Sequence, residues 1–173
     1  RAKLSPGSKV DLDVVLYANE QAVRNGDKYA FGDVGGNFSP YVISQQDGAY
    51  FSIPDFLASA HPIENAADAE AYLSRLSQFA TVLDNETAEQ RRQAARGYLA
   101  PGWAIDLALA QLGELRSAAP AASSMVDALV SRTTTKGISG NWKVRATTIV
   151  GGEVYPALDR QIARTDLDAL DTV

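Results

Sequence analysis

The sequence predicts an all-α fold in which antiparallel helices of mixed length are joined by turns and by one long aromatic and glycine-rich loop at about residues 26–53. Among its 173 residues are 28 alanines and 16 leucines, and both residue types favour helices. Apolar residues recur every three or four positions along most of the chain, which is the spacing of an amphipathic helix. Short segments that contain proline or glycine connect these periodic stretches, and short connections favour antiparallel packing of the helices.

The first helix is expected at residues 8–25, where apolar residues keep helical spacing until Asn25-Gly26. The following stretch, up to residue 53, changes character and contains several glycines and a Ser39-Pro40 turn. Its aromatic residues show no clean period: Tyr29, Phe31, Phe38, Tyr41, Tyr50 and Phe51. Because structureless loops beyond about 12–15 residues are uncommon unless they are functional, we expect an ordered loop that packs onto something large.

A short helix is expected at residues 55–60, with Pro54 in its first turn and His61-Pro62 at its end. Asn65 then offers an N-cap, and Asp68 follows three residues later in a variant of the capping-box pattern. These two residues therefore predict the start of a long helix.

Glycine and proline divide the rest of the chain. The long helix should stop at Gly97, and Pro101 suits the first turn of the next one. A short helix is expected at residues 122–132 and a last one at residues 140–163. Interior glycine costs about 1 kcal/mol and proline about 3 kcal/mol in a helix. We therefore expect a kink near residues 152–156, where both occur.

Composition excludes several classes of site. Cysteine is absent, which removes disulfides, cysteine–zinc sites, iron–sulfur clusters and a thiol nucleophile. His61 is the single histidine, so this chain alone cannot build a site with two histidine ligands. A net charge of −5 argues against a nucleic-acid binder. No apolar run approaches the roughly 18 residues of a membrane span.

The remaining motifs have ordinary interpretations. The glycines of residues 32–36 are not followed by Lys-Ser or Lys-Thr, so the phosphate-binding loop pattern fails. We expect His61 to have a structural role at the turn before Pro62 rather than to belong to a catalytic triad. Four cations without an intervening acid form either a solvated face or an anion site: Arg132, Lys136, Lys143 and Arg145.

Several stretches nevertheless resemble one known family. They are residues 4–17 and 41–48, the proline-started segment 53–63 with its His-Pro-Ile turn, the Tyr-Leu-Ser-Arg-Leu stretch at 72–76, and the motifs at 97–101 and 154–158. Together they are similar to bacterial domain-of-unknown-function 885 proteins, and the resemblance spans about residues 4–163.

This resemblance implies a part of a larger, mostly helical protein. Members of the family resemble zinc metallopeptidases and carry an H-E-x-x-H helix far toward the C-terminus, which supplies two zinc-binding histidines and a glutamate base. This chain lacks the motif. Residues 1–163 are therefore expected to be a helical segment from the N-terminal half, and residues 164–173 a tail of uncertain origin. Zinc is implied for the full-length protein only, and no catalytic or metal-binding residue is assigned to this chain.

We therefore interpret the chain as a non-catalytic scaffold, and one wall of the substrate cleft, in a hydrolase of peptides or related amides. The expected substrate-binding residues are Gln45, Gln46, Asp47 and Tyr50, because binding groups are commonly placed on long loops. The expected partners are the missing C-terminal half and a peptide-like substrate. The alternative is a non-enzymatic interaction module that uses the aromatic loop. For a bacterial protein of this kind we favour an exported or periplasmic location.

Because the sequence begins at Arg1, we expect a processed product or a fragment. An excised fragment should expose apolar surface and form a homo-oligomer or bind a hydrophobic dye. The residues expected to need such cover, besides the loop aromatics, are Trp142, Val144, Ala146, Ile149, Val150 and Val154.

Overall fold

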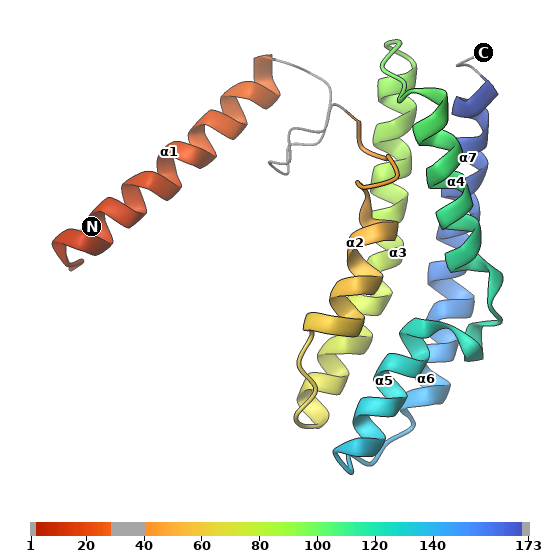
Figure 1. Ribbon diagram of the computed structural model, residues 1–173. Helices are drawn as coiled ribbons and strands as arrows, with labels where there is room; N and C mark the ends of the chain where they lie inside the picture. The colour runs from red at the N-terminus through yellow and green to blue at the C-terminus, as the bar shows by residue number, and fades with distance from the viewer. Residues whose placement is uncertain (1–2, 29–40, 171–173) are drawn as a thin grey trace. The chain divides into compact units, whose positions relative to one another are not determined.

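The computed structural model describes residues 3–28 and 41–170. They belong to two compact units, residues 1–41 and 42–173. Every regular element in the described part of the chain is helical (Figure 1), so the predicted all-α class is confirmed. None of the helices described there is both long and apolar enough to cross a membrane.

Helix α1 (Pro6–Lys28) makes up the described part of the first unit. Its start lies two residues before the predicted one, where the Ser8 backbone N–H donates to Ser5 Oγ at 3.1 Å. It also continues past Asn25-Gly26, so the predicted end there is wrong. A single glycine costs a helix only about 1 kcal/mol, which is too little to stop this one.

The predicted loop at 26–53 is wrong at both ends. Residues 26–28 belong to α1, residues 29–40 lie outside the described residues, and α2 (Ala49–Asp55) begins before residue 53. Pro54 consequently lies inside α2 instead of in a first turn. The π-helical turn η1 (Phe56–Ala60) continues α2 up to His61, so the predicted end at His61-Pro62 is confirmed.

Helix α3 (Ala66–Ala94) is the longest element and starts as predicted. The Asn65 side chain accepts a hydrogen bond from the Asp68 backbone N–H, and the Asp68 carboxylate accepts one from the Asn65 N–H. This reciprocal pair satisfies two of the N–H groups that have no partner within the helix. Gly97 follows the end of the helix with φ at +79°, a conformation that glycine adopts most readily.

Helices α4 (Gly102–Ser117) and α5 (Ser124–Thr135) lie close to their predicted positions, and the short 3₁₀ turn η2 (Pro120–Ala122) lies between them. The last predicted helix consists of α6 (Trp142–Ile149), the π-helical turn η3 (Val150–Val154) and α7 (Tyr155–Leu170).

The π-helical turn η3 lies where a kink is expected, near residues 152–156. There the Tyr155 backbone N–H donates to the Val150 carbonyl, five residues back. This wider turn changes the hydrogen-bond register just before Pro156, whose nitrogen has no proton to donate. Helix α7 crosses residue 163 without a break, and Thr165 and Asp168 are buried.

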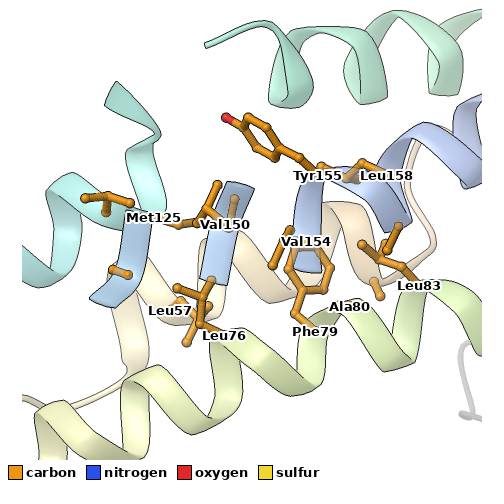
Figure 2. Packing of buried hydrophobic residues seen from close by; sticks show 14 of the residues in the cluster. Leu57, Leu76, Phe79, Ala80, Leu83, Met125, Val150, Val154, Tyr155 and Leu158 are labelled. Atoms are coloured by element: carbon orange, nitrogen blue, oxygen red, sulfur yellow. The ribbon is translucent and has the colours of Figure 1, made fainter. Parts of the chain in front are cut away.

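The unit from residue 42 onward is an up-and-down helical bundle. In Figure 1, α2–η1 runs downward, α3 upward, α4 and α5 downward, and α6–η3–α7 upward. Side chains of α3 meet those of η3 and α7 in one core cluster (Figure 2). The expected antiparallel packing is therefore seen between α2–η1 and α3, between α3 and α4, and between α5 and α6, whereas the consecutive helices α4 and α5 run in the same direction. Polar side chains meet at one end of this bundle, where α2 begins and α3 ends.

The expectation of an uncovered face on the last helix is wrong for most of its residues. Trp142, Ala146, Val150 and Val154 are all buried in the core of this chain, and Ile149 is partly buried against it. The reason is that α3 packs against both α6 and η3, and α5 packs against α6. Val144 is 68% exposed and fits the expectation.

Candidate functional site

The turn before α2 holds the residues predicted to bind substrate. Its backbone closes on itself, because the Ser44 N–H donates to the Asp47 carbonyl at 3.1 Å. The Ser44 hydroxyl donates to Asp47 Oδ2 at 2.8 Å and accepts from the Gln46 N–H at 3.2 Å. Gly48 follows with φ at +123°, and a Cβ atom there would lie 3.0 Å from the Tyr50 ring. Side-chain and backbone bonds thus fix the shape of this turn.

Tyr50 anchors the turn to the bundle. Its ring is buried, and its hydroxyl lies 2.6 Å from the Ser44 carbonyl oxygen and 2.8 Å from Gln111 Oε1 on α4. One hydroxyl proton serves one acceptor at a time, and a rotated Gln111 amide can donate to the hydroxyl oxygen instead. Burial, with the nearby Asp47 and Glu86 carboxylates, raises the pKa of Tyr50 to about 12. The phenol is therefore a neutral hydrogen-bonding group at physiological pH.

Glu86 joins the turn to α3. Its carboxylate oxygens accept hydrogen bonds from the Ala49 N–H at 2.9 and 3.0 Å, at the first residue of α2. A carboxylate at this position satisfies an N–H that has no partner within the helix. The fully buried Gln161 of α7 donates to the same carboxylate at 3.4 Å. One side chain of α3 thus connects α2 to α7.

A second polar group continues along α3 and α7. Gln90 Nε2 donates to Thr165 Oγ1 at 3.1 Å and to Asp168 Oδ2 at 2.7 Å. Arg164 pairs with the other oxygen of the buried Asp168 carboxylate. Charge-assisted hydrogen bonds of this kind fix geometry when they are shielded from water. This cluster is therefore a second polar connection between α3 and α7.

The four predicted site residues have different environments. Gln46 is exposed, Gln45 and Asp47 are half-buried, and Tyr50 is buried. The side chains of Gln45 and Gln46 form no hydrogen bond within residues 3–28 and 41–170. An amide both donates and accepts, so these two side chains can pair with a peptide backbone. That any of the four binds substrate stays a prediction.

His61 occupies a closed environment at the opposite end of α2–η1 from the 44–47 turn. Its ring is 2% exposed, and Arg75 donates to Nδ1 at 2.7 Å. The Nε2 atom lies 3.0 Å from the Asp68 carbonyl oxygen and donates to it, so these partners assign the Nε2–H tautomer. The ring also contacts Tyr72, with centroids 5.3 Å apart. Both ring nitrogens are occupied, and the expected structural position of His61 is confirmed.

Replacing His61 by glutamine is expected to lower the free energy of unfolding by about 1–3 kcal/mol, because the Asp68 carbonyl and the Arg75 guanidinium lose aligned partners in a buried site. In the full-length protein the turnover per folded molecule should not change. Urea denaturation and steady-state kinetics on the same preparation measure the two effects. Retained stability with lost turnover would replace this interpretation with a catalytic one.

The four cations do not converge on an anion site. Lys136 pairs with Glu64 at 2.5 Å, and Arg145 forms two bonds to Glu70, which lower the pKa of the Glu70 carboxyl. Arg132 donates to backbone carbonyls. Three of the four cations are thus used within the chain, which favours the interpretation as an ordinary structural face.

Sequence reasoning did not find Glu86, Gln111 and Gln161. Glu86 lies on the long predicted helix among other charged residues, and no local signal distinguishes its carboxylate. Its role comes from an Ala49 N–H that lies 37 positions earlier. Only a contact between distant segments reveals it.

Comparison with known proteins places this chain in a family. A family model described as "Bacterial protein of unknown function (DUF885)" matches residues 1–171. This chain belongs to the DUF885 family. The match includes most of the stretch from residue 164 that the sequence analysis set apart as a tail.

A solved structure resembles the bundle of this DUF885 chain. It is described as that of a putative lipoprotein from Colwellia psychrerythraea and is 20% identical in sequence, with a TM-score of 0.71. The alignment covers 76% of this chain but 23% of the other. At this identity the likeness shows the fold alone, and this chain spans less than a quarter of that protein. No curated protein matches the sequence.

The described residues of this DUF885 chain do not fit the zinc ion that the resemblance implies for the family. Within them, no group of three or more histidine, cysteine, aspartate or glutamate side chains is arranged to hold a metal ion. The one histidine has both ring nitrogens bonded to protein groups, whereas a zinc ligand must offer a free nitrogen lone pair. No step of a reaction is therefore assigned to a metal on these residues.

Proposed function

We propose that this DUF885 chain is the non-catalytic helical part of a larger metallopeptidase-like hydrolase that cleaves peptide or related amide bonds. The observation that carries the first part of the proposal, a piece of a larger protein, is the alignment to 23% of a much longer protein that contains this fold. The hydrolase activity is what the resemblance to the DUF885 family implies. Residues 42–170 support a scaffold role, because they form a packed bundle in which Tyr50 and His61 are held by structural hydrogen bonds.

The proposed contact with substrate is the 44–47 turn. Its backbone is fixed by the Ser44–Asp47 pair, while the Gln46 side chain extends from it into solvent. A fixed turn that presents an amide orients a peptide with little loss of conformational entropy. Asp47 adds a negative charge at the same place, so we propose that this wall prefers a peptide with a cationic or uncharged group there.

We also propose an exported location for the full-length protein. The description of the Colwellia psychrerythraea relative as a putative lipoprotein supports this, since it has the same fold. Cell fractionation of the bacterium that encodes the full-length protein tests the proposal. Recovery in the cytoplasmic fraction would contradict it.

A non-enzymatic interaction module is the second candidate. It is favoured by an exposed apolar pair on α4, Trp103 at 61% and Leu107 at 49% exposure. The two candidates differ in what the full-length protein does. A hydrolase binds zinc and turns over peptides, whereas an interaction module does neither.

In the full-length protein, Gln46→Ala is expected to raise KM for a peptide substrate by about 3- to 10-fold without changing kcat. The reason is that the variant loses one hydrogen bond that is made equally in the ground and transition states. The matched control is Gln78→Ala, an exposed glutamine on α3, which should leave both constants unchanged. Zinc content and peptide hydrolysis are measured first on the unaltered protein. Absence of both zinc and hydrolysis would contradict the enzymatic proposal, and an unchanged KM would contradict the role of the turn.

A further inference from the structure

We propose that the outer face of α4 is a docking surface for a helix from another part of the same full-length polypeptide, and that this helix presents an apolar stripe flanked by cationic residues. The inference rests on the proposed function only in that it takes this chain to be a part of a longer protein. It adds where the rest of that protein binds.

Helix α4 is apolar on two opposite faces. The residues of its inner face are buried in the bundle: Ala104, Ile105, Ala108 and Leu112. On the opposite face Trp103 is 61% exposed and Leu107 is 49% exposed. They lie four positions apart, so their side chains are neighbours on one stripe. A helix that is apolar on both sides is typical of one buried between two layers.

The outer stripe has room for a close neighbour. Ala110 continues it one turn after Leu107, and Gly113 lies on its flank. A Cβ atom built on Gly113 would meet nothing within 4 Å. Small side chains allow two helix axes to approach closely, and large apolar ones on the partner can fill the space. Trp103 and Leu107 followed by small residues therefore favour a helix as the occupant.

The charge of the stripe indicates the chemistry of that helix. Asp106 lies beside the apolar residues, Glu114 follows Ala110 at the end of the stripe, and both are exposed. Neither carboxylate has a hydrogen bond or an ion pair within the described residues, whereas nearby Arg116 is paired with Asp159 at 2.8 Å. One unpaired carboxylate beside the apolar stripe and one at its end favour a partner with lysine or arginine at the matching positions.

The relative length of the matched structure favours the same polypeptide as the source. That protein contains this fold in 23% of its chain, so most of it is available to cover the bundle. Exposed apolar patches of this kind mark interaction sites in folded proteins. A second copy of the chain is the competing occupant, and the experiment separates the two.

Cysteine labelling measures whether the face is covered. This chain contains no cysteine, so Leu107→Cys in the full-length protein adds one labelling site on α4. The cysteine is labelled with a maleimide, and peptide mass spectrometry measures how fast that site reacts. In the native protein we expect labelling at least about tenfold slower than in the same protein unfolded in urea. Trp103→Cys should show the same protection.

Asp106→Lys combined with Glu114→Lys should restore fast labelling of Leu107→Cys, because the partner helix would meet like charge. Labelling of Leu107→Cys at its unfolded rate overturns the inference. Protection that disappears when the protein is diluted from dimer to monomer assigns the face to a second copy and also overturns it. The labelling needs no substrate, so a full-length protein that lacks hydrolysis but protects Leu107→Cys would refute the proposed hydrolase and support this docking surface.

Discussion

Replacing Phe79 by alanine is expected to lower the free energy of unfolding by about 3–5 kcal/mol. Phe79 is fully buried on α3 and faces the core beside Val154 of η3, as Figure 2 shows. Because α3 packs along η3 and α7, the helices around the cavity cannot easily close on it. Urea denaturation followed by circular dichroism measures the loss.

Phe51→Ala is the matched control, since it removes the same side chain from a position on α2 that is 50% exposed. It should cost clearly less, about 1–2 kcal/mol, because about half of the Phe51 side chain stays in water on folding. Equal losses for the two variants would contradict the placement of the core between α3 and the last helix.

Arg132→Met is expected to lower the free energy of unfolding by about 2–4 kcal/mol. The Arg132 guanidinium donates to the carbonyls of His61 at 2.6 Å, Leu57 at 2.5 Å and Ala128 at 2.9 Å. It also lies over the Tyr72 ring, 5.6 Å from the centroid. Methionine fills a similar volume but leaves the buried His61 and Leu57 carbonyls without the Arg132 donor, and an unsatisfied buried acceptor is costly. Chemical denaturation at neutral pH gives the difference.

The control for this change is Arg145→Met. It removes an arginine of the next helix, α6, together with its bidentate pair to Glu70. Both members of that pair are about half exposed, and an exposed ion pair contributes little to stability because water and salt screen it. A small effect of Arg132→Met, similar to that of the control, would mean that the Arg132 hydrogen bonds do not stabilise the fold. The interpretation of the cationic segment as an anion site would then be favoured.

Helix starts and ends could be predicted wherever the signal is local. The Asn65–Asp68 capping box, the stop at His61-Pro62 and the end of α3 before Gly97 all depend on residues within a turn of one another. Local backbone preferences and caps act over this range, so the residue order is enough to define them. The family resemblance likewise needed only short stretches of sequence, and the family model confirms it.

By itself the sequence therefore determined the helical class, the position of most helices, and the absence of cysteine and of a histidine pair. The tertiary structure decided which residues are joined across the chain. It placed the start of α2 at Ala49 through Glu86, buried Trp142 and Val150 in the chain's own core, and used Arg132 to bind distant carbonyls. The physical reason is that helix formation is governed by hydrogen bonds between residues four apart. Burial and long-range hydrogen bonds depend on which helix faces meet, and that is set only when the whole bundle packs.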